Sequence, residues 1–392
     1  MKIKDRILQF VNKPVNNILS SQTLYEALLA NINMYLKYNE NIYAKRSKKI
    51  AKLITETQLP DGGFDIGYNF SFGNNMIKKS EKESTTPEVL SIFALLKYYE
   101  IFQDKNIISS IKKGIEWIES KVFINEKGLY VIPYAPCSYK EVHITNAISF
   151  TVATLGYYRY LFRDDKYDKI CKDMLKYMRQ ELIINNNMGY WNYFEKSLMK
   201  QKNYIKVDNY HISQQLYYHM LLDKYFENHD NKEIIKLVSN YIKHKLELDI
   251  AVPYIEIEKK ITTDIHSWGY CSLLLCSLKF KDKQYTNRIL NYIMDNMIME
   301  DHFLPVIKRT GEIINKEYYP RSDAWVLHAL SEYLLVEEND KEVYEIVNKG
   351  LKKLEENKYK GLENHVYTFR KRIFTKCVNI IKMIGSNKWN FG

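Results

Sequence analysis

The sequence is poor in glycine and cysteine, and it contains no long apolar run. Its 14 glycines among 392 residues form neither a GxGxxG dinucleotide fingerprint nor a P-loop. No stretch approaches the ~18 uninterrupted apolar residues of a membrane-spanning helix, and the first residues lack the apolar core of a signal peptide. The sparse, odd-numbered cysteines favour free thiols in a reducing compartment; they are Cys137, Cys171, Cys271, Cys276 and Cys377. We therefore expect a cytoplasmic protein.

The composition favours a large folded domain with an anionic partner. Hydrophobic residues make up 46% of the chain, and the 33 tyrosines offer flat apolar faces with polar tips that suit sugar rings as well as cores. The formal net charge of +11 favours acidic glycans, phosphates or lipid headgroups. No signature of a nucleic-acid-binding module is present, so we expect no nucleic-acid partner.

A polar helix start followed by an apolar helix recurs along the chain. Its reference residues are Glu88, Asn146, His211, His266 and Asp323, at intervals of 58, 65, 55 and 57 residues. Each apolar helix leads into a turn, a more charged helix and a loop of aromatic and small residues. After a short N-terminal helix, the pattern predicts six helical pairs, at about 16–58, 86–122, 146–182, 211–246, 266–299 and 323–354.

Six hairpins of this kind favour a closed ring. The first helix of each pair is apolar nearly all round and must be covered on both sides, whereas an open array would leave two ends needing caps. We predict an all-α fold, an (α/α)6 toroid of six helical hairpins over residues 1–356 with short β-hairpin loops at one mouth, and a basic amphipathic tail over residues 357–392. The inner helices would all start at that mouth, where helix N-termini favour carboxylate or phosphate groups.

One turn carries a resemblance to known proteins. The segment from Gln58 through Asp61-Gly62-Gly63-Phe64 resembles the QxxDGGF signature shared by the (α/α)6 toroid proteins of carbohydrate metabolism and the squalene-cyclase-like repeats. The loops and helix starts are most similar to polysaccharide-biosynthesis toroids related to the catalytic domain of glucuronyl C5-epimerases. The resemblance implies a carbohydrate-active protein of glycan assembly. The catalytic tyrosines and glutamates of that family do not map onto this sequence, and none is carried over.

The predicted mouth supplies the candidate site residues. The candidates for catalysis are Glu88, His143, His211, Asp264, His266, Arg321 and Asp323. The candidates for substrate binding are Tyr68, Tyr134, Asn146, Trp191, Tyr210, Trp268, Tyr319 and Trp325. Capping alone explains some helix starts, since Thr86, Asp208, Asp264 and Ser322 fit N-cap positions. Capping does not call for three histidines, an arginine and several tryptophans, so the pattern favours a pocket for a polar ligand.

Three functions fit these residues. A uronate epimerase or lyase removes a proton beside a carboxylate, which would use Arg321 as the cationic clamp and His143, His211 or His266 as acid or base. A glycoside hydrolase needs two carboxylates ~5 to 9.5 Å apart, for which Glu88, Asp264 and Asp323 are the candidates. A toroid that only binds a glycan or a partner protein is the third. Sequence spacing does not measure distance across a ring, so all three remain open.

No cofactor and no metal ion are expected. Cys271 and Cys276 lie five residues apart on poorly aligned faces of a predicted helix, unlike zinc ligands. Asp164, Asp165 and Asp168 match the DDxxD pattern of magnesium–diphosphate sites, but they fall in the turn opposite the mouth. We interpret them as a solvated helix start.

The C-terminal segment 370–384 has a basic amphipathic pattern. Its apolar stripe consists of Ile373, Cys377, Ile380, Ile381 and Ile384, and Arg372, Lys376 and Lys382 lie off that stripe. Such a helix suits peripheral contact with an anionic membrane surface, here the inner face of the membrane. The alternative is a closing helix that packs on the flank of the toroid with its lysines in water.

Overall fold

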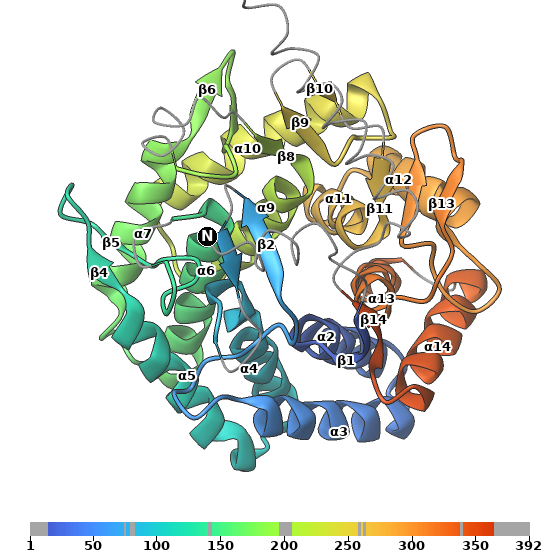
Figure 1. Cartoon of the computed structure of the whole chain (residues 1–392), viewed down its shortest axis with the longest axis horizontal. Coiled ribbons are helices and arrows are strands. Elements are labelled where there is room, and N and C mark those ends of the chain that lie inside the picture. The colour runs from blue at the N-terminus through green and yellow to red at the C-terminus, as the bar shows by residue number, and fades with distance from the viewer. Residues whose placement is uncertain are drawn as a thin grey trace, which may run out of the picture.

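In the computed structural model, helical hairpins form a closed double ring (Figure 1). The structure describes residues 15–73, 76–78, 83–139, 143–195, 206–257, 260–261, 264–337 and 340–363, and these contain twelve α-helices. The inner helices are α2 (Ser21–Tyr38), α4 (Leu90–Phe102), α6 (Thr145–Phe162), α9 (Asn209–Leu222), α11 (Ser267–Phe280) and α13 (Pro320–Val336). The outer helices are α3 (Asn41–Thr57), α5 (Ile108–Lys121), α7 (Asp168–Glu181), α10 (His229–Leu248), α12 (Lys283–Met297) and α14 (Lys341–Glu356).

The ring closes because the last inner helix packs against the first. Helix α13 lies between α11 and α2, and each other inner helix contacts the next one in the chain. Inner helices are accordingly buried on nearly all sides, as in α6 and α11. Outer helices bury one stripe only, which in α14 consists of Val343, Val347, Leu351 and Leu354. The prediction of an all-α (α/α)6 toroid is confirmed.

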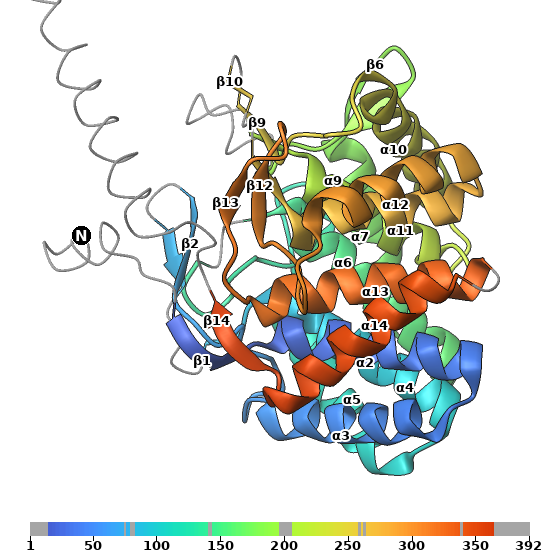
Figure 2. The same cartoon turned by 90° about the vertical axis from the view of Figure 1, so that its right-hand side faces the viewer.

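Short antiparallel strands gather mainly at one end of the ring (Figure 2). The strands β2 (Phe70–Gly73) and β3 (Met76–Lys78) form a hairpin, which is joined to α3 by the segment 58–69. Two three-stranded sheets each combine a strand that leads into an inner helix with the hairpin that follows the next outer helix. The first consists of β8 (Val207–Asp208), before α9, and of β9 (Ile255–Ile257) and β10 (Lys260–Ile261), after α10. The second consists of β11 (Asp264–His266), before α11, and of β12 (Val306–Lys308) and β13 (Ile313–Asn315), after α12. The hairpins after α5 and α7 are β4 (Phe123–Ile124), β5 (Tyr130–Val131), and β6 (Ile183–Asn185), β7 (Met188–Tyr190).

The two ends of the described chain pair with each other. Strand β1 (Val15–Leu19) runs antiparallel to β14 (Lys360–Glu363). This corrects the prediction that the first helix of the ring starts near Asn16. Asn17 has a φ of +59°, which interrupts regular structure, and α2 starts only after Ser20, whose hydroxyl accepts a hydrogen bond from the Gln22 amide.

The predicted division into a toroid and a tail remains a prediction. Residues 360–363, assigned to the tail by sequence, form β14, and the basic segment 370–384 lies outside the described residues. None of the helices in the described ranges is both long and apolar enough to cross a membrane.

The Gly-Gly turn directs the chain from α3 back toward the inner helix starts. Asp61 holds this turn by accepting hydrogen bonds from the Gly63 amide at 3.0 Å and the Trp117 indole at 3.1 Å. Gly62 has a φ of +99°, and a Cβ there would lie 2.3 Å from the Lys113 carbonyl oxygen, so only glycine fits. The turn thereby fixes the start of the segment that carries Tyr68.

Candidate functional site

Arg321 is the centre of a polar cluster at the end of the ring where the inner helices start, which we call the mouth. It lies in the first turn of α13, and its Nη1 donates to the Tyr68 hydroxyl at 3.1 Å. Its Nε lies 3.6 Å from Glu363 Oε2, and the guanidinium lies 5.3 Å from the centroid of the Trp268 ring. Burial opposes the charge, but Tyr68 and Glu363 hold the pKa of Arg321 above its ordinary value. Arg321 therefore remains a cation.

Glu88 is the second ionisable group of the mouth. It belongs to the 3-10 turn η1 (Thr86–Val89), in which Pro87 occupies an early position, and it is 1% exposed. Its carboxylate accepts hydrogen bonds from the Ser21 hydroxyl and, at 3.1 Å, from the Gln22 side-chain amide. Burial raises the pKa of Glu88 to about 7, against these hydrogen bonds. Glu88 can therefore gain or lose a proton near neutral pH.

Glu363, at the end of β14, is a site residue that the sequence did not reveal. Thr23 Oγ1 donates to its Oε1 at 3.3 Å, and Arg321 faces its Oε2. Burial raises the pKa of Glu363 to about 7; Arg321 opposes this shift and Glu88 adds to it. The two carboxyl groups thus disfavour each other's ionised form. The one available signal was its position as the last acidic residue before the basic segment.

His266 and Trp268 form the wall of the mouth beside Arg321. His266 is the residue before α11, and its ring lies 4.7 Å from the Tyr254 ring and 6.4 Å from the Trp268 ring. Burial, followed by the charge of Arg321, lowers the pKa of His266 to about 3. The imidazole is therefore neutral at neutral pH.

His211 continues this wall toward the fourth hairpin. Its ring lies 5.5 Å from the Trp268 ring and 5.7 Å from the Tyr193 ring. Its Nδ1 is 2.8 Å from Asp208 Oδ2, without the alignment of a hydrogen bond. Asp208 also accepts from the His211 amide at 3.1 Å, which confirms it as the N-cap of α9. Burial opposes ionisation of Asp208, yet His211 and Lys206 hold the pKa of this carboxyl below its ordinary value.

A narrow crevice lies beside His211. Its lining includes Asn146, Trp191 and Asp208, so the structure brings Asn146 and Trp191 to the same place as His211. The Trp191 indole donates to the Met178 carbonyl at 2.9 Å, which also gives it a structural role. Tyr134 is buried close by, with its ring 6.3 Å from the ring of Phe70, the first residue of β2.

Several predicted site residues face other parts of the ring. His143 Nδ1 lies 2.9 Å from Glu195, which also accepts from Tyr177 of the outer helix α7, so His143 faces the outer layer. Asp323 is fully buried and accepts from the Phe303 amide at 3.1 Å.

The remaining four predicted site residues are positioned by backbone contacts or by packing. Tyr210 donates to the Val252 carbonyl at 3.1 Å, and Tyr319 packs against Val306. Asp264 is paired with Lys308 in the β11–β12 register. Trp325 lies one helical turn beyond Arg321, with its ring 6.2 Å from the Tyr25 ring.

Three predicted N-caps are wrong. The residues before η1, α11 and α13 are Thr85, His266 and Tyr319. Thr86 is already inside the 3-10 turn, and Asp264 is inside β11, which extends to the first residue before the helix. Ser322 is inside α13 because the helix starts at Pro320, a residue suited to the first helical position.

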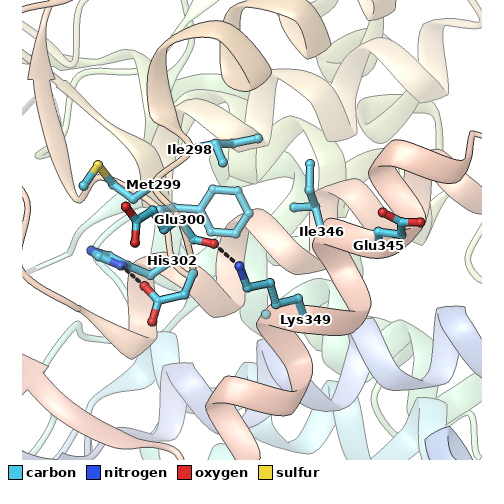
Figure 3. A pocket seen from close by; sticks show the side chains of 10 residues that line it. Ile298, Met299, Glu300, His302, Glu345, Ile346 and Lys349 are labelled. Carbon is cyan, nitrogen blue, oxygen red and sulfur yellow. Dashed lines mark hydrogen bonds and ion pairs between the residues drawn. The ribbon is translucent and has the colours of Figure 1, made fainter.

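A separate pocket of about 180 Å³ lies on the flank of the ring, between the loop after α12 and helix α14 (Figure 3). Lys349 donates to the Glu300 carbonyl oxygen across it, and His302 Nδ1 lies 2.8 Å from Asp301. None of the predicted site residues lines this pocket. The flank is therefore distinct from the mouth.

Potential metal ligands cluster at one place in the described part of the chain. Side-chain atoms of His229, Asp230 and Glu233 lie within 4.8 Å of one another at the start of α10. Glu233 is already bound to Arg179 at 2.7 Å. The arrangement is that of an ion pair at a helix start rather than a metal site, and the expected absence of a metal remains a prediction.

The fold is shared with solved structures of sugar-acting enzymes. No family model matches the chain, and no curated protein matches it in sequence. Cellobiose 2-epimerase from Bacillus thermoamylovorans B4167 has a TM-score of 0.60 at 13% identity, over 83% of this chain and 96% of that chain. D-mannose isomerase has a TM-score of 0.55 at 13% identity, over 86% and 90% of the two chains. A family 105 glycoside hydrolase from C. acetobutylicum ATCC 824 has a TM-score of 0.57 at 13% identity, over 84% and 96%. At these identities the comparison establishes the fold, the (α/α)6 toroid.

Proposed function

We propose that the protein is a carbohydrate-active enzyme that binds an acidic sugar at the mouth. The observation that carries the proposal is the placement of the Arg321 cation beside Trp268, with Glu88 and the neutral His266 in the same mouth. A cation, an aromatic face and groups that exchange protons are the parts that recognition and turnover of an acidic sugar require. The sugar-acting enzymes of the same fold support this choice.

The acidic group of the sugar is bound by Arg321. A guanidinium offers five N–H donors in a planar fork that matches a carboxylate. Tyr68 and Glu363 engage Nη1 and Nε, while no group in the described ranges pairs with Nη2. Glu363 can gain or lose a proton near neutral pH, because its pKa is about 7. Protonation of Glu363 would leave the charge of Arg321 available to the ligand.

The reaction we favour is proton abstraction beside the sugar carboxylate, as in an epimerase or lyase. Glu88 takes the proton, and the C–H electron pair moves toward the carboxylate carbon, so that negative charge builds on the carboxylate oxygens facing Arg321. In an epimerase a proton returns to the opposite face of the carbon. In a lyase the electron pair instead expels the substituent on the neighbouring carbon. A base with a pKa near the working pH is the effective one, which favours Glu88 over the weakly basic His266.

A glycoside hydrolase is the second candidate. Glu88 and Glu363 are both buried, and each raises the energy of the other's ionised form. One of the two can therefore be protonated while the other is ionised, which would supply the acid and the carboxylate of glycoside hydrolysis. Of the carboxylates that the sequence suggested for this role, Asp264 lies in β11 opposite Lys308 of β12, and Asp323 faces the Phe303 loop. A toroid that only binds a glycan or a protein is the non-enzymatic alternative.

Deuterium incorporation separates these functions. The protein is incubated in D₂O with oligosaccharides that end in glucuronate, galacturonate or mannuronate, and the products are analysed by mass spectrometry and NMR. An epimerase or lyase gives deuterium at the carbon beside the carboxylate or a new double bond, and Glu88→Gln lowers that rate by about 10²- to 10⁴-fold. Glu345→Gln, on the outer helix α14, is the control.

The other outcomes are equally specific. Cleavage of neutral oligosaccharides without exchange at carbon would contradict proton abstraction and favour the hydrolase. Binding without any turnover would leave only the binding toroid.

The setting we propose is polysaccharide assembly in the cytoplasm. The basic segment 370–384 would contact an anionic membrane surface there, which suits an enzyme that serves lipid-linked glycans. This segment lies outside the described residues.

A further inference from the structure

A line of side chains continues from the mouth into the middle of the ring. Arg321, Trp325 and His328 are separated by four and three residues along α13, so they lie on one face of that helix. His328 Nδ1 lies 2.5 Å from Glu26 of α2. The Trp325 ring lies 6.2 Å from the ring of Tyr25, which precedes Glu26 in α2. The line therefore passes along the contact between the first and last inner helices.

Tyrosines from the opposite side of the ring meet this line. Helix α9 stands across the ring from α2 (Figure 1). Its Tyr217 ring lies 6.2 Å from the His328 ring, and the rings of Phe93 and Phe150 each lie 5.2 Å from the Tyr218 ring. These contacts involve α4, α6, α9 and α13 together, which places Tyr218 near the axis of the ring. Burial raises the pKa of Tyr218, and the Glu26 charge adds to it, consistent with a short separation.

Polar atoms at this level lack partners. Glu26, Tyr218, Trp325 and His328, which we call the axial site, are at most 3% exposed. Glu26 Oε1, Tyr218 Oη and Trp325 Nε1 are buried, and no described group forms a hydrogen bond with any of them. Leaving such an atom unpaired costs about 1–3 kcal/mol. Three in one region point to a ligand that pairs with them.

On the side away from the mouth, the axial site is bounded by an ion pair between α11 and α13. Glu332, one turn beyond His328 on α13, is bound by Lys279 and accepts from the Asn33 amide at 3.2 Å. Lys279 also lies 5.6 Å from the centroid of the Tyr217 ring. A ligand of the axial site would therefore enter from the mouth.

We propose that the axial site binds the hydroxyl-bearing end of the sugar whose acidic group lies at Arg321. The choice of a sugar rests on the proposed function; the site itself rests on the three unpaired atoms. Glu26 Oε1 accepts, Trp325 Nε1 donates and Tyr218 Oη does either, and sugar hydroxyls both donate and accept. The other carboxylate oxygen of Glu26 already lies against His328 Nδ1, which favours a neutral polar group over an ion as the ligand.

This arrangement defines a substrate class. Because the sugar would enter from the mouth and end against the Lys279–Glu332 contact, the enzyme would act on free sugars or chain ends and not on the interior of a polymer.

The test combines crystals and binding with two probes, D-glucose and D-glucuronate. Crystals soaked in D-glucose are expected to show ring hydroxyls within hydrogen-bond distance of Glu26 Oε1, Tyr218 Oη and Trp325 Nε1. In calorimetric titrations, Tyr218→Phe and Trp325→Phe are expected to weaken binding of both probes by about 5- to 30-fold. Tyr43→Phe is the matched control, since Tyr43 is buried but donates to Asn348 of the outer layer.

The outcomes separate the axial site from the proposed function. Density for either sugar at the mouth alone, or in neither place, overturns the axial site, as do affinities of Tyr218→Phe and Trp325→Phe that match that of Tyr43→Phe. D-glucose retained at the axial site in Arg321→Ala, with loss of D-glucuronate, supports both proposals. D-glucose at the axial site in a protein that shows no turnover of any sugar supports the axial site and contradicts the enzymatic function.

Thermal unfolding of the ligand-free protein provides a second measurement. If the hydroxyl of Tyr218 stabilised the fold, its removal would lower the unfolding temperature of the protein. Tyr218→Phe is expected instead to unfold at the same or a higher temperature, because its hydroxyl has no partner in the described structure. A clear fall in the unfolding temperature would assign Tyr218 to the fold and count against the axial site.

Discussion

The buried carboxyl of Glu88 should make the stability of the protein depend on pH in a defined direction. Its pKa is raised from 4.5 to about 7 on folding. A raised pKa means that the folded state holds the proton more tightly than the unfolded state does. The contribution of Glu88 to the free energy of unfolding is therefore fully present below pH 4.5 and is lost as the pH rises through about 7.

The size of this effect follows from the shift. A change of one pKa unit corresponds to about 1.4 kcal/mol, so a shift of this size corresponds to about 3 kcal/mol. Glu88→Gln removes the titrating group and keeps the shape of the side chain. The fall in the free energy of unfolding between about pH 4.5 and about pH 8 should thus be about 3 kcal/mol smaller in the variant than in the natural protein.

Urea unfolding at several pH values measures this difference. The comparison of the two proteins cancels the titration of groups that they share, such as Glu26 and Asp323. Glu345→Gln, which changes an exposed carboxyl on α14, should follow the natural protein throughout. Glu363→Gln should reduce the pH-dependent fall in the free energy of unfolding as Glu88→Gln does. In the double variant the reduction should be smaller than the sum of the two single reductions, because the two carboxyl groups affect each other. Parallel curves for the natural protein and Glu88→Gln would refute the reasoning.

Four further outcomes follow. Arg321→Ala should weaken uronate binding by at least about 30-fold and leave D-glucose binding nearly unchanged, as measured by calorimetry; equal losses for both sugars would contradict a carboxylate clamp. Trp268→Ala should weaken the binding of both sugars, because it removes an aromatic face at the mouth. Trp117→Phe serves as the control for loss of a tryptophan, since the Trp117 indole donates to Asp61 at the turn. Asp323→Asn should retain activity within a few-fold, since Asp323 faces the Phe303 amide; a loss as large as that of Glu88→Gln would restore it as a catalytic candidate. A chain that ends at Glu363 keeps β14 and should float less with anionic liposomes than the full chain, and equal flotation would end the proposal of membrane contact.

The fold was accessible from the sequence because its repeat is local. Each hairpin carries its own apolar inner helix, turn and amphipathic outer helix, and that pattern needs no knowledge of distant contacts. The first helix start was misplaced because Asn16 and Asn17 belong to a strand whose partner, residues 360–363, is at the far end of the chain. Strand pairing over that separation leaves no periodic signal.

The sequence pattern did not show which side of its helix each candidate site residue faces. Arg321 and Asp323 were assigned to the same mouth, yet successive residues of a helix are rotated by about 100°, so two residues apart they point in nearly opposite directions. Arg321 faces Tyr68 and Trp268, whereas Asp323 faces the loop of Phe303. Glu363 and the Glu26–His328 pair were missed because their partners lie about 40 to 340 residues away, on elements that only the closed ring brings together.

The pairing of β1 with β14 has a consequence for biosynthesis. The carboxyl of Glu363 that faces the Arg321 guanidinium is delivered by the last described strand, so it leaves the ribosome after every helix of the ring. A nascent or truncated chain that lacks this strand would hold a buried cation without its counter-charge, and its first and last helices would lack the strand that ties them together. The Arg321 cluster is thus complete only once β14 has been synthesised, so a chain that stops before residue 360 would lack part of the mouth.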